Sequence, residues 1–480
     1  MSDVSDWLAT ADRSADWSGV NATVAGLGDS GFAAADALLR VGARVEVIES
    51  RDLTDSDVLQ RRAEVLGALG ASVNGKAGPD QIIAADLLVP SPGLAPHHPW
   101  IRHSRASLIW SGEQLAWQLR PGDVPWLTVT GTNGKTTTVQ MVNAILDRAG
   151  YASVAVGNIG VPMAEAIFLE PQPQVFVVEL SSYQLHFTQK ISAHTSALLN
   201  IATDHLDWHE SFDAYKVAKG RIFNDTQRAI VYNHDDATTE GLAEQAEVIA
   251  GCRAIGFTLG VPQRSMLGVV DGVLVDRAFV SIRSTHATEI VAVDDLPISS
   301  PHLVADALAA AAVARSFGVS IDDVRHGLMG FAVDDHRGTL VDAIDEVAYV
   351  DNSKATNVHA ADVALSSVDS VVWIAGGLAK GGSFDDIVTK HAAQLRAVVL
   401  LGQDQDRIAE ALERHAPEVP VFAVPAGETD PMLHAVRAAA VAAQPHDTVL
   451  LAPACASMDQ FADYRARGRA FADAVARLRL

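Results

Sequence analysis

Residues 130–138, TGTNGKTTT, combine glycines, a lysine and threonines at a spacing suited to phosphate chemistry. Gly131 and Gly134 allow backbone N–H groups to approach phosphate oxygens, and the helix expected to follow adds the dipole of its N-terminus. Lys135 can bridge the terminal phosphates of a nucleotide, and the hydroxyl of a following threonine can reach Mg²⁺. The residues predict a nucleotide-phosphate loop of the form G-x-x-G-K-T, shorter than the usual G-x-x-x-x-G-K-[ST].

Two polar groups further along the chain could complete a metal site. Glu179 ends the apolar run VFVVE (175–179), and a carboxylate after a strand is suitably aimed to hold Mg²⁺ beside a phosphate loop. The cluster DHLDWH (204–209) follows another apolar run and offers two histidines and two aspartates. Its residue types leave two interpretations open: a surface turn, or a ligand role for at least one side chain.

A second phosphate signal lies near the N-terminus, in VAGLGDSG (24–31). Gly26, Gly28 and Gly31 follow an apolar run, an Ala/Leu-rich helix is expected next, and Glu49 follows the second strand. This is the spacing of a dinucleotide-binding fingerprint, in which the glycines and the helix N-terminus receive a pyrophosphate. The fingerprint by itself predicts a ligand with a pyrophosphate and leaves a nicotinamide or flavin oxidoreductase open.

Polar residues also follow three apolar runs in the last third of the chain: DNSK (351–354), GGLAK (376–380) and PACAS (453–457). Ligands of open α/β sheets bind beyond the carboxyl ends of the strands. The three loops can therefore converge on one crevice.

The elements that must position these residues alternate between strands and helices, which predicts an α/β protein with parallel sheets. A chain of 480 residues is too long for one core, and about 100–200 residues per domain suggests three domains. We place the domains at residues 1–112, 113–332 and 333–480. Short alternating runs within 256–298 predict a small antiparallel flap, and 301–317 predicts a helix that Gly318 ends.

The composition narrows the class of protein. A net charge of −23 argues against a general nucleic-acid binder, which needs a basic surface. Two cysteines exclude a disulfide framework and fit a reducing compartment. The N-terminus is acidic and polar, unlike a signal peptide, and no apolar run approaches the ~18 residues that a membrane span needs. We expect a cytoplasmic protein without nucleic-acid or membrane partners.

Together the motifs resemble those of the Mur ligase family, the ATP-dependent amide-forming enzymes of peptidoglycan precursor synthesis. They span all three predicted domains in the family's order: TGTNGKTTT (130–138), GNIGVP (157–162), ELSSYQL (179–185), DHLDWH (204–209), AYKVAKGRIF (214–223), DDHR (334–337), DNSKATN (351–357), GGLAKGGSF (376–384) and PACASMDQF (453–461). The last three of these, and SPG (91–93), are most similar to the members that add D-glutamate.

The resemblance implies an α/β fold of three domains: a Rossmann-like N-terminal domain, a central P-loop ATPase-type domain with the antiparallel flap, and a Rossmann-like C-terminal domain. It also implies a reaction in which ATP phosphorylates the carboxylate of UDP-N-acetylmuramoyl-L-alanine. The amine of D-glutamate then displaces phosphate from the acyl phosphate and forms an amide. The cofactors implied are ATP and Mg²⁺ at two sites, with Mn²⁺ as a substitute, and we expect a monomer.

Residue roles follow from the same resemblance. The catalytic residues implied are Lys135, Glu179, His205, Lys219 and Asn158, the last beside the γ-phosphate. The ATP contacts implied are Gly131, Thr132, Asn133, Gly134, Lys135, Thr136, Thr137, Arg337 and Asn352. The metal ligands implied are Thr136, Glu179, His205 and a carbamylated Lys219. The UDP-substrate contacts implied are Gly28, Asp29, Ser30, Glu49, Ser50, Arg51, Ser91, Pro92 and Gly93. The D-glutamate contacts implied are Lys354, Thr356, Lys380, Ser457 and Tyr464.

The chain departs from the family pattern in two places. The family has H-N-x-x-N, whose asparagines contact adenine, where this chain has HLVAD (302–306). The members that add D-glutamate have an aspartate directly before SKATN, whereas this chain has Asp351 followed by Asn352. Three alternative functions are an oxidoreductase, an amide ligase with another amino-acid or a folate acceptor, and a non-catalytic nucleotide-binding relative. The oxidoreductase would leave the phosphate loop, Glu179 and the C-terminal lysines without a purpose.

Overall fold

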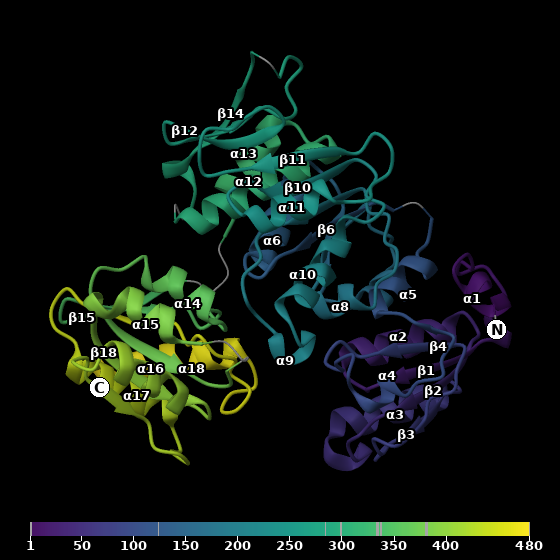
Figure 1. The fold of residues 1–480 in the computed structure, drawn as a ribbon, viewed down its shortest axis with the longest axis horizontal. Helices are drawn as coiled ribbons and strands as arrows, with labels where there is room; N and C mark the ends of the chain where they lie inside the picture. The colour runs from purple at the N-terminus through teal and green to yellow at the C-terminus, as the bar shows by residue number, and fades with distance from the viewer. Residues whose placement is uncertain are drawn as a thin grey trace. The chain divides into compact units, whose positions relative to one another are not determined.

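The computed structural model describes residues 2–122, 124–283, 285–297, 300–332, 336, 338–379 and 383–479. The chain forms two compact units, one made of Met1–Ile201 with Asp213–Phe331 and the other of Ala202–Phe212 with Ala332–Leu480. Both units consist of β-sheets covered by α-helices (Figure 1). The fold is therefore α/β, as the sequence predicts.

The N-terminal part of the first unit holds a five-stranded sheet in which every strand pair is parallel. In spatial order its strands are β3 (Ser72–Asn74), β2 (Arg44–Ile48), β1 (Asn21–Ala25), β4 (Leu87–Pro90) and β5 (Leu108–Ile109). The middle strand β1 and its neighbour β4 are buried along almost their whole length, as expected of a parallel sheet covered on both faces. Strand order and direction are those of a Rossmann-like domain.

A nine-stranded sheet forms the rest of the first unit. In spatial order its strands are β14 (Thr288–Ala292), β13 (Val273–Asp276), β12 (Met266–Val270), β11 (Arg253–Phe257), β10 (Ala229–Asn233), β9 (Thr195–Leu198), β6 (Trp126–Thr130), β8 (Val175–Glu179) and β7 (Ser153–Gly157). Within this sheet, β12–β13 and β13–β14 are antiparallel, and the other described pairs are parallel. The expected flap is therefore present, and it continues the central sheet through the parallel pair β11–β12.

Helices of the first unit connect and cover these strands. They are α1 (Ser2–Leu8), α2 (Asp29–Arg40), α3 (Asp57–Ala68), α4 (Pro99–Arg102), α5 (Gly112–Leu119), α6 (Lys135–Arg148), α7 (Met163–Ala166), α8 (Ser182–His186), α10 (Phe212–Gly220), α11 (Ala237–Glu244), α12 (Pro301–Phe317) and α13 (Ile321–Met329). The helix predicted at 301–317 is confirmed as α12, and it ends where Gly318 takes φ = 100°, a left-handed conformation that favours glycine. In the described part of the chain, no helix has the length and apolar character needed to cross a membrane.

The second unit holds a six-stranded sheet. In spatial order its strands are β15 (Thr339–Ile344), β16 (Val347–Asp351), β20 (Thr448–Leu451), β17 (Val371–Gly376), β18 (Leu395–Leu401) and β19 (Val421–Ala423). Its helices are α9 (Leu206–His209), α14 (Val358–Leu365), α15 (Asp385–His391), α16 (Gln405–His415), α17 (Pro431–Ala442) and α18 (Tyr464–Ala476). The antiparallel edge strand β15 was not expected from the sequence, whereas the parallel strands β16, β17 and β20 match the three apolar runs that precede DNSK, GGLAK and PACAS.

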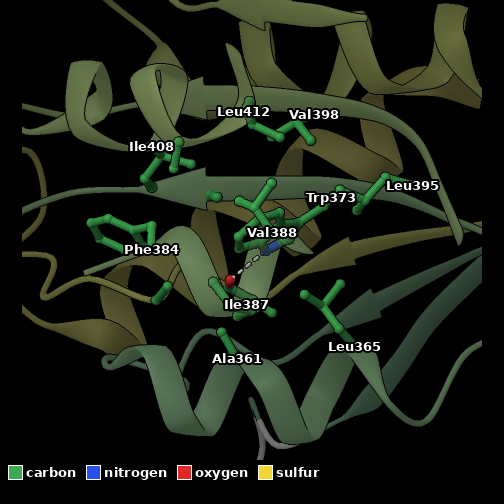
Figure 2. Packing of buried hydrophobic residues seen from close by; sticks show 14 of the residues in the cluster. Ala361, Leu365, Trp373, Phe384, Ile387, Val388, Leu395, Val398, Ile408 and Leu412 are labelled. Atoms are coloured by element: carbon green, nitrogen blue, oxygen red, sulfur yellow. Dashed lines mark hydrogen bonds between the residues drawn. The ribbon is translucent and has the colours of Figure 1, made fainter. Parts of the chain in front are cut away.

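The central strand β17 of this sheet divides the core in two because its side chains alternate between the faces. Trp373 points to the face covered by α14, α15 and α16, and its Nε1 donates to Ala452 O at 2.7 Å (Figure 2). Its neighbours Val372 and Ile374 point to the face covered by α17 and α18. Both faces are buried, which explains why the sequence of β17 is a continuous apolar run.

Candidate functional site

The phosphate loop lies between β6 and α6, where the sequence predicts it. Gly134 precedes α6 with φ = 83°, a left-handed conformation, and provides no side-chain cap. A Cβ at this position would lie 2.2 Å from Asp306 Oδ1 of α12. Glycine is therefore required both by the backbone angle and by the space. The first N–H groups of α6 face the loop as donors for an anion.

Two sets of hydrogen bonds hold the loop in shape. Lys135 Nζ folds back over it and donates to Gly131 O at 2.8 Å and to Thr132 O at 2.9 Å. From the loop after β9, the strand next to β6, Asn200 accepts from the Asn133 N–H at 2.9 Å and donates to Asn133 O at 3.1 Å. The sequence analysis missed this asparagine, whose only signal is its position directly after the apolar run that forms β9.

Glu179 ends β8 and is completely buried. Its Oε1 accepts a hydrogen bond from Asn158 Nδ2 at 2.8 Å, because the parallel register of β7 and β8 pairs Gly157 with Glu179. Within the described residues, Oε2 of Glu179 has no hydrogen-bond partner. A buried carboxylate oxygen without a donor is costly unless a cation approaches it. The register of β6 and β8 also pairs Glu179 with Val129, directly before the phosphate loop.

Lys219 reaches the same loop from α10 and is only 2% exposed. Its Nζ donates to Gly131 O at 2.7 Å and to Thr130 Oγ1 at 3.3 Å. Tyr215, one turn earlier, lies with its ring centroid 5.0 Å from this Nζ, and its hydroxyl is hydrogen-bonded to Thr132 Oγ1 at 2.8 Å. The structure thus brings Lys135, Lys219 and the buried Glu179–Asn158 pair to the carboxyl ends of neighbouring strands.

The other predicted metal ligands differ in their position. Thr136 and Thr137 are buried in the first turn of α6. His205 belongs to the second unit, where it precedes α9 with φ = 54°, so its metal role stays a prediction. Among the residues with described positions, no group of three or more His, Cys, Asp or Glu side chains could hold a metal ion. A metal near Glu179 would therefore also need oxygen ligands from a threonine hydroxyl, from phosphate and from the carbamate of a carbamylated Lys219.

The N-terminal fingerprint forms a tight turn between β1 and α2. Gly26 has φ = 93°, and a Cβ on Gly31 would lie 2.0 Å from Gly26 O, so both positions require glycine. From the end of β2, Glu49 accepts the Leu27 N–H at 2.8 Å and two guanidinium N–H groups of Arg51 at 2.9 Å. Burial raises the pKa of Glu49, but these hydrogen bonds outweigh it and bring the pKa to about 2. The Glu49 carboxylate is therefore charged at neutral pH and holds the loop through its hydrogen bond from the Leu27 N–H.

The remaining predicted UDP-substrate contacts gather at the same end of the sheet. Ser91 follows β4, the neighbour of β1, and its hydroxyl donates to Gly26 O at 3.3 Å. The predicted contacts lie after β1 (Gly28, Asp29, Ser30), after β2 (Glu49, Ser50, Arg51) and after β4 (Ser91, Pro92, Gly93). The sequence analysis missed Arg62, which reaches this loop from α3.

In the second unit, the predicted D-glutamate contacts follow β16 and β20, which are adjacent. Lys354 Nζ lies 5.4 Å from the centroid of the Tyr464 ring. Asn352 and Thr356 lie on the same loop as Lys354, and Ser457 is buried in the loop after β20. Two further predicted residues, Arg337 and Lys380, lie outside the described residues.

Arg467 ties these loops together and was missed by the sequence analysis. It lies on α18, is 1% exposed, and its Nε donates to Ser353 Oγ at 3.0 Å. Its Nη2 donates to Ser353 O at 3.0 Å and to Cys455 O at 3.1 Å, which joins the loops after β16 and β20. Burial lowers the pKa of Arg467 to about 10, so the guanidinium stays charged at neutral pH.

A cavity of about 490 Å³ opens beside these contacts within the second unit. Its lining comprises His336, Thr339, Val341, Asp351, Tyr464, Arg465, Arg469 and Ala472. His336 Nδ1 lies 2.5 Å from Asp351 Oδ2, and a Cβ on Gly468 would lie 2.1 Å from the same nitrogen. The cavity is therefore lined by residues of β15, the end of β16 and α18, and Tyr464 is the predicted D-glutamate contact that lines it.

Comparison with known proteins agrees with the motifs. Three family descriptions match: "Mur ligase MurD-like, N-terminal domain" at residues 20–109, "Mur ligase middle domain" at 129–314, and "Mur ligase, glutamate ligase domain" at 336–455. The UDP-N-acetylmuramoylalanine–D-glutamate ligase of Streptomyces avermitilis is 52% identical over 464 residues, which cover 96% of this chain and 98% of that protein. The ligase of the same name from Streptomyces coelicolor is 50% identical over 469 residues, or 96% of this chain and 99% of that protein.

Solved structures share the fold. The UDP-N-acetylmuramate–alanine ligase of Thermotoga maritima superposes with a TM-score of 0.56 at 19% identity, over 95% of this chain and 99% of that chain. The pseudomurein peptide ligase type C of Methanothermus fervidus superposes with a TM-score of 0.55 at 17% identity, over 90% of this chain and 96% of that chain.

Proposed function

The chain belongs to the Mur ligase family, and we propose that it is an ATP-dependent ligase that adds D-glutamate to UDP-N-acetylmuramoyl-L-alanine in peptidoglycan precursor synthesis. The observation that carries the proposal is the phosphate loop with Lys135 and Lys219 hydrogen-bonded to it and the buried Glu179 one strand away. The choice of D-glutamate is supported by relatives of that name at 52% and 50% identity over 96% of the chain.

Each predicted domain takes one substrate in this proposal. Residues 1–112 bind the UDP portion at the fingerprint, 113–332 bind ATP, and 333–480 bind D-glutamate. The protein acts in the cytoplasm as a monomer and has no nucleic-acid or membrane partner. The strongly acidic net charge of −23 supports the lack of nucleic-acid binding.

In the first step, a carboxylate oxygen of UDP-N-acetylmuramoyl-L-alanine attacks the γ-phosphorus of ATP, the bond to the β–γ bridging oxygen breaks, and ADP leaves. Lys135 and the N-terminus of α6 hold the phosphates and stabilise their charge. Mg²⁺, or Mn²⁺ in its place, would neutralise phosphate charge when bound. Thr136 and Glu179 would hold the ion, since the buried Glu179 Oε2 has no hydrogen-bond partner in the described part of the chain.

In the second step, the amine of D-glutamate attacks the acyl carbon, phosphate leaves, and the nitrogen loses a proton to give the amide. Lys354 and Lys380 are the proposed partners of the two D-glutamate carboxylates, with Thr356, Ser457 and Tyr464 around them. The contact of the Lys354 ammonium with the Tyr464 ring supports a preformed cationic site. Positioning two anions for reaction is the main task of these residues.

Lys219 is the proposed site of carbamylation, which converts the amine into a carboxylate-like metal ligand. Its burial beside the phosphate loop supports this role, because a lysine cation at such a place would be an unusual neighbour for a metal. Lys219→Ala should lose turnover, and short-chain carboxylic acids should restore part of it by filling the same space. Full activity in unrescued Lys219→Ala would contradict the role.

A substrate panel tests the function as a whole. ADP release should require UDP-N-acetylmuramoyl-L-alanine, ATP and D-glutamate together, and L-alanine or meso-diaminopimelate should not replace D-glutamate. Absence of stimulation by D-glutamate would overturn the assignment. Stimulation by another amino acid instead would indicate an amide ligase that uses that amino acid.

A further inference from the structure

Arg62 of α3 reaches the fingerprint loop between β1 and α2 in the N-terminal sheet domain. Its Nη1 donates to Leu27 O at 3.2 Å, and its Nη2 contacts the carboxylate of Asp29, the first residue of α2. The Arg62 side chain is 23% exposed, while that of Asp29 is 80% exposed. The Arg62 guanidinium is therefore bound to the loop backbone, whereas its partner Asp29 is largely exposed to solvent.

The charges around the loop make this arginine important for an anionic ligand. Asp29 places a negative charge in the first turn of α2, where a diphosphate would be received. Glu49 adds a second carboxylate, but Arg51 already neutralises it through two hydrogen bonds. Without Arg62, a diphosphate approaching α2 would meet the charge of Asp29 uncompensated.

The guanidinium of Arg62 is suited to do more than neutralise Asp29. A guanidinium has five N–H groups, and the described contacts to Leu27 and Asp29 use two of them. Its planar fork matches phosphate oxygens better than the compact charge of lysine does. Because Arg62 is held at the loop in the free protein, little side-chain entropy remains to be lost on binding.

We propose that Arg62 binds the diphosphate of the uridine nucleotide substrate at the N-terminus of α2, and that Asp29 positions its guanidinium. The inference rests on the proposed function, which assigns a UDP-linked substrate to this domain. It gives Arg62 a role separate from that of Arg51, whose guanidinium makes two hydrogen bonds to Glu49 at the end of β2. Arg62 is thus a selectivity residue for a nucleoside diphosphate over the same nucleoside with fewer phosphates.

Calorimetric titration of the full chain with UDP, UMP and uridine tests the proposal. Arg62→Ala should weaken UDP binding by about tenfold or more and leave uridine binding within about twofold. Arg62→Lys should recover only part of the UDP affinity. The matched control is Arg61→Ala, which removes the exposed neighbouring arginine of α3 and should change neither affinity.

The outcomes separate direct contact from other roles. Equal weakening of UDP and uridine in a folded variant would mean that Arg62 only maintains the loop, and it would overturn the proposal. Recovery of UDP affinity in the double variant Asp29→Asn, Arg62→Ala would also overturn it, because Arg62 would then serve only to neutralise Asp29. Failure of the unaltered chain to bind UDP would contradict the proposed function itself, and the role of Arg62 with it.

Discussion

Glu113→Gln should remove a pH dependence of stability that one buried carboxyl group imposes. Glu113 lies on α5, is 3% exposed, and accepts a hydrogen bond from Gln184 Nε2 through Oε1 at 2.6 Å. No residue in the described part of the chain is hydrogen-bonded to its Oε2. Burial raises the pKa of Glu113 to about 7, although hydrogen bonds from its own backbone and from Gln184 act in the opposite direction.

The size of the effect follows from this pKa. The ordinary value is 4.5, so the folded protein holds the proton more tightly than the unfolded chain does. The difference corresponds to about 3 kcal/mol of stabilisation, complete only below about pH 4.5 and lost as the pH rises through about 7. As the pH rises from about 5 to about 8, the ionisation of Glu113 should therefore lower the free energy of unfolding by about 2–3 kcal/mol.

Urea unfolding at several pH values measures this contribution. Tryptophan fluorescence is a suitable signal, because Trp117 of α5 and Trp126 of β6 lie edge to face at 5.1 Å near Glu113. Glu113→Gln should be more stable than the unaltered chain at about pH 8, and the advantage should shrink toward about pH 5. Glu165→Gln, on the exposed side of α7, is the control. An equal pH dependence in Glu113→Gln and the unaltered chain would refute the reasoning.

Three further substitutions test the sites. Gly134→Ala should weaken ATP binding by about tenfold or more in equilibrium titrations. The control is Gly42→Ala: Gly42 has a similar φ of 88° but open space around it, so this variant should lose only about 1 kcal/mol of stability and bind ATP unchanged. Equal effects of the two substitutions on ATP binding would contradict the steric argument. Glu179→Gln should raise the Mg²⁺ concentration required for half-maximal ADP release by about tenfold, measured by metal titration; an unchanged requirement would exclude Glu179 as a ligand. Arg467→Lys keeps the charge but cannot maintain the three hydrogen bonds to the loops, so the KM for D-glutamate should rise about tenfold with the KM for ATP unchanged; parallel increases in both would indicate general unfolding.

The parts of the fold that could be predicted from the sequence are those with strong local signals. Continuous apolar runs predicted parallel strands such as β8, β17 and β20. Pro301 and Gly318, at the two ends of α12, predicted its bounds to the residue. The edge strand β15 lacks such a signal, because its residues are only partly buried and its partner β16 determines its pairing. The flap was recognised from its alternation, but its continuity with the central sheet depends on the pair β11–β12, which no local pattern specifies.

The candidate sites show the same division. The glycines and Lys135 are specified by spacing along the chain, because a loop and the following helix form the phosphate site. Asn200, Arg62 and Arg467 act on loops far away in the sequence, and a single polar residue does not reveal which backbone it will meet. Their roles are set by the packing of helices and strands. The roles in binding and catalysis assigned to the site residues, those of His205, Arg337 and Lys380 among them, stay predictions.

Oxygen-18 transfer tests the central claim most directly. UDP-N-acetylmuramoyl-L-alanine labelled with oxygen-18 in its carboxylate is incubated with ATP, Mg²⁺ and D-glutamate, and the products are analysed by mass spectrometry. The proposed mechanism predicts that the released phosphate gains one labelled oxygen while the new D-glutamyl amide retains the other. Unlabelled phosphate together with amide formation would contradict an acyl phosphate, and the absence of a D-glutamyl product would contradict the assigned reaction.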